Sequence, residues 1–272
     1  MSDIWIEQPE LSKSPVKRNC CRVDPVKLFV LVAFAATLFY LLLPAVQGER
    51  NAAQHRSECR NNLKQIGMAL HNYHDEYGCF PPPCIADKNG RPAHSWRVLL
   101  LPFMDETQLY NEYRFDEPWN GPHNSTLAGR MPRLFHCPSD SPKDKDPARW
   151  MTSYVAVIGP QTMWPGDRPI AIPDITDGLD KTIGVVETFN SGIHWMEPRD
   201  LQVLQMAPII SSKSGQGISS GHLKQGQGPS AHAGGATVLL MDGAVRFLPD
   251  TLPPDLIRAL LTRNVGESVG DF

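Results

Sequence analysis

The 272-residue chain contains 41% hydrophobic and 20% charged residues, a composition that excludes an intrinsically disordered protein. The formal net charge is −3, and Lys and Arg are scattered along the chain, so the sequence gives nucleic-acid binding no support. The 21 Gly and 25 Pro fall mainly after Gly78, which predicts short strands and many turns in the C-terminal region.

The strongest local signal is an apolar segment without charged side chains at residues 28–46. A helix rises about 1.5 Å per residue, so this segment spans roughly the 30 Å hydrocarbon core of a bilayer. We therefore expect residues 1–27 to form a leader, residues 28–46 a transmembrane helix, and residues 47–272 the folded domain. A cleaved signal peptide is the alternative, but the long leader and the absence of a small-x-small site favour a retained anchor.

The basic residues that flank this segment decide its orientation only weakly. Five precede it and four follow it: Lys13, Lys17, Arg18, Arg22 and Lys27, then Arg50, Arg56, Arg60 and Lys64. Four of the six cysteines follow the segment, which suits an oxidising compartment. We expect a single-pass membrane protein with a cytoplasmic leader and a periplasmic or cell-surface domain.

Beyond the apolar segment, helical periodicity continues on one stripe. The stripe consists of Cys59, Leu63, Ile66, Leu70, Tyr73 and Tyr77. Gly78 favours a left-handed C-terminal cap, and the three prolines at 81–83 forbid continuation. One helix over residues 28–77 is therefore predicted, with its second half packed against the domain, as in pilins and pseudopilins.

Five blocks of the sequence carry a specific resemblance. They are LLLPAVQGERNAAQHRSECRNNLKQIGMALHNYHDEYGCFPP at 41–82, SWRVLLLPFMDETQLY at 95–110, PWNGPHN at 118–124, FHCPSD at 135–140 and WMEPRDL at 195–201. In these blocks the chain resembles the planctomycete DUF1559 proteins from about Leu42 to Phe272.

A sixth block, HAGGATVLLMDGAVRFL at 232–248, is the most diagnostic, because nine residues separate His232 from Asp242-Gly243. This spacing is similar to the H-x9-DG element found with prepilin-type proteins. The resemblance implies a pseudopilin-like surface or periplasmic protein, related to type II secretion components, and transfers no catalytic residue.

The leader departs from the prepilin pattern. A prepilin shows Gly before an apolar run and a Glu at the fifth mature position, whereas this chain reads VDPVKLF at 23–29. Pro25, Lys27 and the missing Glu argue against prepilin cleavage and against the docking of neighbouring subunits. A solitary, uncleaved anchor is the simpler interpretation.

His71 and His74 lie three residues apart on the long helix, a spacing that two ligands of one metal can use. Leu70 and Tyr73 occupy the packing stripe, so we expect the two histidines to border it as hydrogen-bonding residues. The sequence therefore predicts no metal and no cofactor.

Four cysteines are candidates for disulfides. Cys79 and Cys84 flank a short Phe-Pro-Pro-Pro segment and can close a small loop if it turns, which leaves Cys59 and Cys137 as the second pair by elimination. Free buried thiols are the alternative for both pairs. Cys20 and Cys21 are interpreted as free thiols.

Residues 236–241 and 244–248 flank Asp242-Gly243 and predict a β-hairpin, because Gly accepts positive φ and Asp bonds the nearby backbone. His232 with Ser230 or Ser220 offers a base and a nucleophile, but no G-x-S-x-G, HExxH or phosphate-binding glycine motif accompanies them. Residues 211–229, rich in Ser, Gly and Gln, predict a loop.

The sequence thus predicts an α+β protein in which a long N-terminal transmembrane helix continues as a spine on a mainly antiparallel sheet. Short helices are expected near 95–113 and at 257–262. The predicted function is non-catalytic display, scaffolding or assembly, with the lipid bilayer and pseudopilin-like or secretion-system subunits as partners. A ligand- or polymer-binding module, or a hydrolase using His232, is the alternative.

Overall fold

The computed structural model describes residues 24–140, 150–166, 168–210, 217–220, 234–267, 269–270 and 272, and within α1 it leaves out the side chains of residues 35 and 40–53. The chain divides into two compact units, Met1–Glu49 and Arg50–Phe272. Residues 1–23, with Cys20 and Cys21, lie outside the described residues. So do residues 211–216 and 221–229 of the predicted loop, and residues 230–233 that follow it.

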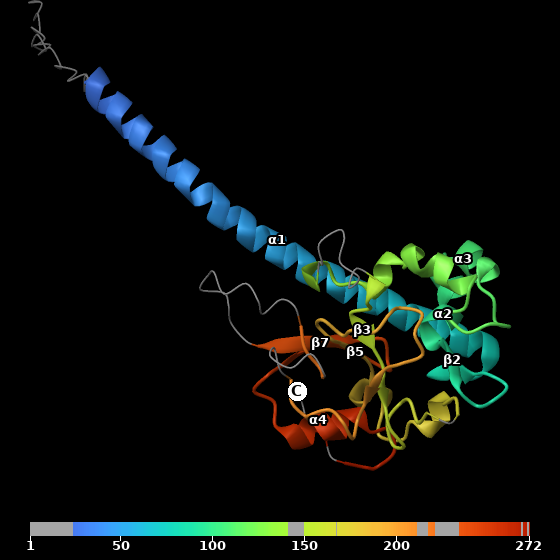
Figure 1. Cartoon of the computed structure of the whole chain (residues 1–272). Helices are drawn as coiled ribbons and strands as arrows, with labels where there is room; N and C mark the ends of the chain where they lie inside the picture. The colour runs from blue at the N-terminus through green and yellow to red at the C-terminus, as the bar shows by residue number, and fades with distance from the viewer. Residues whose placement is uncertain are drawn as a thin grey trace, which may run out of the picture. The chain divides into compact units, whose positions relative to one another are not determined.

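The first helix, α1, extends from Pro25 to Tyr77 (Figure 1). It begins three residues before the predicted start, because the carboxylate of Asp24 accepts the backbone N–H of Val26 at 3.1 Å and proline is favoured in the first helical turn. Its predicted end at Tyr77 is confirmed, and Gly78 follows with a φ of 73°. Among the described residues, no helix combines the length and the apolarity that a membrane crossing requires.

The main sheet of the second unit has the strand order β3-β5-β7-β8, and every neighbouring pair is antiparallel. The strands are Tyr154–Val155, Ile183–Glu187, Gly235–Leu240 and Val245–Pro249. Two smaller sheets pair β1 (Cys84–Ala86) with β2 (Pro92–Ser95) antiparallel and β4 (Val157–Ile158) with β6 (Leu201–Gln202) parallel. The fold is therefore α+β with mainly antiparallel pairing.

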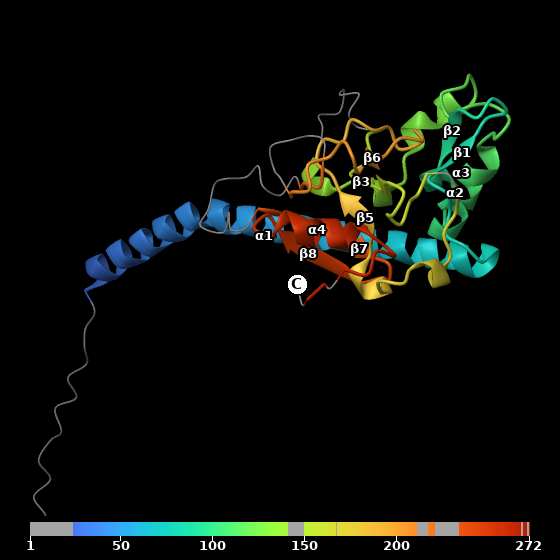
Figure 2. The same cartoon turned by 90° about the horizontal axis from the view of Figure 1, so that it is seen from below.

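Helices cover both faces of the main sheet. On one face Val185 and Leu239 join the core of α1 residues that includes Leu63 and Ile66. On the other face Val186 and Val238 pack with the final helix, α4 (Pro254–Leu261). Figures 1 and 2 show β5 and β7 between the C-terminal part of α1 and α4. Because both faces are covered, every residue of β5 and β7 is buried.

The second unit also contains short helical segments outside the main sheet, α1 and α4. They are α2 (Trp96–Leu99), η1 (Leu101–Met104), α3 (Thr107–Glu112), η2 (Asn124–Arg130), η3 (Arg133–Phe135), η4 (Pro138–Asp140), η6 (Ile172–Asp174) and η7 (Leu179–Lys181). The helices expected near 95–113 and the last helix, expected at 257–262, are thereby confirmed.

The predicted packing stripe of α1 is confirmed at its first five positions and is wrong at the last. Cys59, Leu63, Ile66 and Leu70 are buried and Tyr73 is half-buried, whereas Tyr77 is 58% exposed. Tyr77 lies in the last turn of the helix, where its ring contacts the rings of Tyr73 and Phe103. Periodicity identified the face of the helix but not the point at which the domain ceases to cover it.

Candidate functional site

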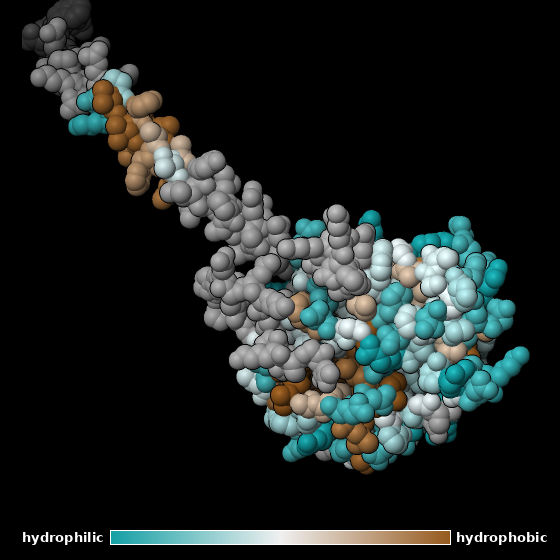
Figure 3. Space-filling view, viewed as in Figure 1, coloured by the Kyte–Doolittle hydropathy of each residue, from teal (hydrophilic) through white to brown (hydrophobic). Residues whose placement is uncertain are grey.

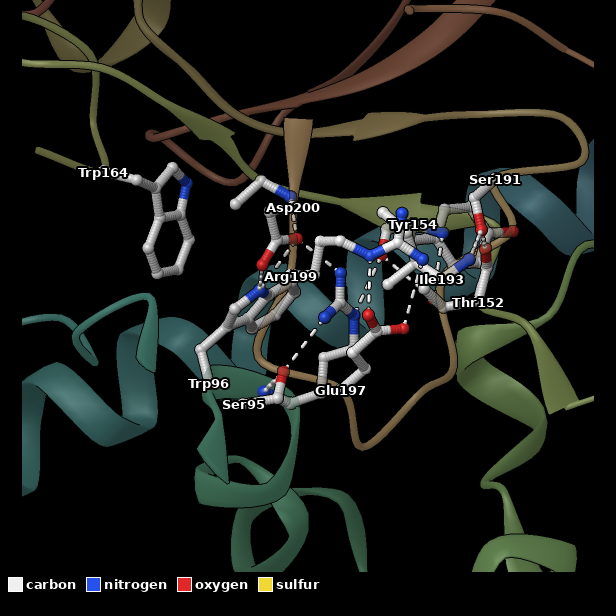
Figure 4. Close-up of polar contacts among 12 residues, drawn as sticks. Ser95, Trp96, Thr152, Tyr154, Trp164, Ser191, Ile193, Glu197, Arg199 and Asp200 are labelled. Carbon is white, nitrogen blue, oxygen red and sulfur yellow. Dashed lines mark hydrogen bonds and ion pairs between the residues drawn. The ribbon is translucent and has the colours of Figure 1, made fainter. Parts of the chain in front are cut away.

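A buried charged centre forms where α2 meets the segment that leads into β6. Asp200 accepts hydrogen bonds from Arg97 Nη2 at 2.5 Å, from Trp96 Nε1 at 3.2 Å and from the backbone N–H of Ala156 at 2.8 Å. Figure 4 shows Trp96 beside Asp200. The side chains of Arg97 and Asp200 are 0% and 2% exposed. This centre joins three segments that are far apart in the sequence.

The other two nitrogens of the Arg97 guanidinium also donate hydrogen bonds. Its Nε donates to the carbonyl of Tyr154 at 3.2 Å and its Nη1 to Ser95 Oγ at 2.9 Å, while its guanidinium lies 4.8 Å from the Trp96 ring centre. Trp96 in turn packs on Trp164 with ring centres 5.2 Å apart. Because all three guanidinium nitrogens donate hydrogen bonds, this ion pair fixes the relative position of the segments that contribute to it.

Burial acts on both members of this pair. Loss of hydration lowers the pKa of Arg97 and raises the pKa of Asp200, while their mutual charge and hydrogen bonds oppose both shifts. Three N–H donors converge on Asp200, an arrangement that favours an ionised acceptor. The centre is therefore a structural ion pair, and neither group is presented to solvent.

The pairing of Arg97 with Asp200 was not predicted. Both residues lie in blocks that carry the family resemblance, SWRVLL and WMEPRDL, and each block places a charged residue near a tryptophan. A charged residue close to a Trp in such a block is a signal of a buried ion pair. The two partners, however, are 103 residues apart in the sequence. Nothing in the local sequence indicates which charge meets which.

A second buried centre surrounds Glu187 at the end of β5. Cys59 on α1 and Cys137 form a disulfide with a Cα–Cα distance of 5.3 Å. Their Sγ atoms and a carboxylate oxygen of Glu187 all lie within 4.8 Å of one another. The helix, the segment between η3 and η4, and the main sheet therefore meet at one point.

The carboxyl of Glu187 is 1% exposed, and burial raises its pKa to about 7. The backbone N–H of Thr237, which donates to Glu187 Oε2 at 3.2 Å, opposes this shift, as does a hydrogen bond from the Ser220 side chain. The negative charge of Asp140 adds to the rise. The sequence analysis did not predict Glu187 as a site residue. Its position as the last residue of an apolar strand is only a weak signal of a buried carboxyl group.

The helix histidines serve the structure, as expected. His71 Nε2 lies 2.9 Å from the carbonyl oxygen of Met241, so this nitrogen carries the proton of that hydrogen bond. His74 Nε2 accepts the backbone N–H of Ile172 at 3.4 Å. Both rings also pack against Phe80. These hydrogen bonds connect α1 to the segments around Met241 and Ile172.

The expected disulfide between Cys79 and Cys84 is wrong, since both are free thiols. The intervening segment bonds other parts of the domain: the Phe80 N–H donates to the carbonyl of Ile170, and the carbonyl of Pro83 accepts the N–H of Trp96. Successive prolines favour extended backbone, which advances roughly 3.3 Å per residue and keeps the ends apart. Cys84 instead lies in β1, opposite Ser95.

The hairpin around Asp242 and Gly243 is confirmed as β7 and β8. Asp242 Oδ1 accepts the N–H of Ala244 at 2.8 Å, and Gly243 has a φ of 86°. These two residues of the H-x9-DG element thus form a turn, in which Asp242 N–H also bonds the carbonyl of Leu179. His232 and Ser230 lie outside the described residues, so the hydrolase alternative stays a prediction.

Comparison with protein families matches residues 49–255 to the family described as "Protein of unknown function (DUF1559)". No curated protein and no solved structure gives a significant match. The matched range contains both buried centres and the Asp242-Gly243 turn. On this match, which covers most of the sequence, the chain belongs to the DUF1559 family.

Proposed function

We propose that this protein is a membrane-anchored, extracytoplasmic scaffold, pseudopilin-like and non-catalytic. The observation that carries the proposal is the surface of the first half of α1. Nine large apolar side chains there are 50–75% exposed, and Figure 3 shows them as an apolar surface. They are Val26, Leu28, Phe29, Val30, Leu31, Val32, Phe34, Leu38 and Phe39.

Such a surface is unfavourable in water. Removing one Val, Leu or Phe side chain from water is worth about 1.5–3 kcal/mol, so covering the whole set favours an apolar environment strongly. Exposed apolar patches of this extent mark contact with a membrane or another protein. Because the apolar residues surround the helix rather than forming one stripe, a lipid environment explains them better than one packed partner.

The disulfide between Cys59 and Cys137 supports placement of the second unit outside the cytoplasm. Disulfides persist in oxidising compartments and are rare where thioredoxin and glutathione keep thiols reduced. Both sulfurs are buried in the core of the unit, which is typical of a structural bridge. We therefore propose an inside leader, an anchor at 28–46 and a periplasmic or cell-surface domain.

The scaffold role rests on the way α1 is used within the second unit. Its residues from Cys59 to Leu70 supply one side of the core that the main sheet completes. A helix that is both anchor and core element holds its domain at the membrane without a separate linker. The partners we propose are the lipid bilayer and pseudopilin-like or secretion-system subunits.

Alkaline carbonate extraction of membranes tests the anchor. The intact chain is expected in the membrane pellet, and the variant Phe34→Arg/Leu38→Arg in the supernatant, because an Arg near the centre of an inserted helix costs about 3 kcal/mol. Leu204→Arg is the matched control, since Leu204 is 90% exposed in the second unit and should leave extraction unchanged. Release of the intact chain by carbonate contradicts the proposal.

Chemical crosslinking in intact membranes tests assembly separately. Discrete higher-order species whose crosslinks map to α1 are expected of a scaffold subunit. An intact, membrane-bound chain that crosslinks only as a monomer contradicts the assembly part of the proposal and leaves the anchor untouched.

An aromatic cluster favours a second candidate function, a ligand- or polymer-binding module. The rings of Tyr73, Tyr77 and Phe103 contact one another, and Tyr77 is largely exposed. Aromatic rings with polar tips suit wet binding surfaces. Sedimentation with insoluble polysaccharides tests this: Tyr77→Ala should reduce binding at least tenfold, and an unchanged bound fraction rejects the module.

A further inference from the structure

Three side chains with metal-ligating atoms converge in the core of the second unit. Cys59 comes from α1, Cys137 from the segment between η3 and η4, and Glu187 from the end of β5. Their two Sγ atoms and one carboxylate oxygen lie within 4.8 Å of one another, and all three residues are buried. In the oxidised protein the two sulfurs are bonded to each other and neither is a thiolate ligand.

We propose that this centre has a second state, in which the reduced thiols of Cys59 and Cys137 and the carboxylate of Glu187 bind one Zn²⁺ ion. Thiolate and carboxylate are ordinary zinc ligands, with Zn–S near 2.3 Å and Zn–O near 2.0–2.2 Å. Around a tetrahedral ion such ligand atoms lie about 3.5–4 Å apart, which is compatible with the spacing observed here. Three protein ligands leave one position for water.

The chemistry balances with a dithiol as reductant. Its two thiols become a disulfide, and the two electrons and two protons convert the bridge into two cysteine thiols. Zn²⁺ then displaces a proton from each thiol, and also the proton of Glu187 when that carboxyl is protonated. The disulfide and the zinc complex are therefore mutually exclusive states of Cys59 and Cys137. Oxidised cysteines form the bridge, and reduced cysteines bind the ion.

The surroundings of Glu187 suit a metal ligand. The backbone N–H of Thr237 holds Oε2 at 3.2 Å and the Ser220 side chain also bonds the carboxyl, so its orientation is fixed from outside the site. Asp140 adds a negative charge nearby, and its Oδ2 accepts from Ser153 Oγ at 3.2 Å. A dication in this position offsets the repulsion between the two carboxylates and the thiolates.

The test uses the full chain with the remaining cysteines replaced, Cys20→Ser/Cys21→Ser/Cys79→Ser/Cys84→Ser, so that only the bridge can supply thiolates. The protein is reduced with a phosphine, desalted without oxygen and titrated with Co²⁺ and then Zn²⁺. One equivalent of Co²⁺ should give a thiolate-to-cobalt charge-transfer band that Zn²⁺ abolishes. The oxidised protein should give no such band.

Glu187→Gln should weaken Zn²⁺ binding at least tenfold in the reduced protein. Glu197→Gln is the matched control, because Glu197 is a partly exposed carboxylate bonded to Arg199, and it should leave the affinity unchanged. No charge-transfer band on reduction, an equal band in the oxidised protein, or an unchanged affinity in Glu187→Gln each overturns the proposal.

Near-UV circular dichroism checks the fold in parallel. A reduced chain that keeps its native spectrum, or regains it on addition of Zn²⁺, is the expected result. A reduced chain that unfolds and stays unfolded with Zn²⁺ overturns the proposal, since the three ligands then have no common site.

Discussion

The two buried carboxyl groups of Asp200 and Glu187 differ in their surroundings and therefore in their protonation. Asp200 lies against Arg97, so its charge is matched by a cation. Glu187 lies beside a disulfide and near a second acid, with burial raising its pKa to about 7. The first group is stable as an anion, while the second changes its protonation state near neutral pH.

The raised pKa of Glu187 predicts a pH dependence of stability. Its ordinary value is 4.5, so between about 4.5 and 7 the folded protein holds a proton that the unfolded chain has released. The free energy of unfolding should therefore fall by roughly 3 kcal/mol across this range, and Glu187→Gln should remove that fall. Urea unfolding at several pH values measures it.

His194 has the opposite effect on the pH dependence of stability, over a similar pH range. Burial lowers its pKa from 6.5 to about 4, so there the unfolded chain binds the extra proton and stability rises with pH. His194 is present in both the wild type and the Glu187→Gln variant. The difference between their free energies of unfolding therefore reports the effect of the glutamate alone. A pH-independent difference contradicts this prediction.

The buried ion pair predicts a large cost for losing one partner. Arg97→Met or Asp200→Asn should lower the free energy of unfolding by about 3–5 kcal/mol, because the remaining group is buried without its counter-charge. The double variant Arg97→Met/Asp200→Asn should lose less than the sum of the two single changes. Urea unfolding of the three variants gives the coupling energy.

An exposed ion pair supplies the control for this series. Arg258 bonds Asp255 at 2.7 Å, with the two side chains 59% and 92% exposed. Arg258→Met should change stability by no more than about 1 kcal/mol, as is usual for surface pairs. Additive effects at Arg97 and Asp200 would show that the two residues act independently.

At the scale of elements, the turn between β7 and β8 depends on one glycine. Gly243 has a φ of 86°, and within the described part of the chain, its two chain neighbours aside, no heavy atom lies within 4 Å of the position that a Cβ would take. Gly243→Ala should therefore cost about 1–2 kcal/mol from backbone strain alone. Gly243→Asn should cost less, because Asn tolerates the left-handed region better.

Thermal or urea unfolding measures these changes, with Gly217→Ala as the control. Gly217 lacks a positive φ, and among the described residues beyond its chain neighbours no heavy atom lies within 4 Å of its Cβ position, so its replacement should be nearly neutral or slightly stabilising. Equal losses at Gly217 and Gly243 would exclude backbone conformation as the cause.

At the scale of the whole chain, one covalent link joins α1 to the rest of the second unit. The bridge between Cys59 and Cys137 spans 78 residues. Constraining a loop of this length in the unfolded chain is worth roughly 4 kcal/mol in the entropic model. The variant Cys59→Ser/Cys137→Ser should lose about that much stability in urea unfolding without reductant.

The free thiols provide a matched control for this prediction. Cys79→Ser/Cys84→Ser removes two partly buried thiols that form no bridge, so the free energy of unfolding should fall far less. Reductant should lower the stability of the Cys79→Ser/Cys84→Ser variant and leave the Cys59→Ser/Cys137→Ser variant unchanged. The opposite pattern would assign the bridge to the wrong pair.

Features set by neighbouring residues were predictable from the sequence by itself. The helix ends at Tyr77 because Gly78 takes a left-handed conformation and prolines follow. Asp242 and Gly243 form their turn because both the side-chain bond and the positive φ are local properties. Family blocks in the sequence likewise indicated DUF1559 membership.

Features that join distant segments were decided only by the tertiary structure. The meeting of Arg97 with Asp200 and the burial of Glu187 beside a disulfide depend on which strands and helices pack together. Cys79 and Cys84 are free thiols, although their spacing in the sequence permits a bridge. Sequence patterns report conformation over a few residues, whereas the energy of a buried charge depends on every segment around it.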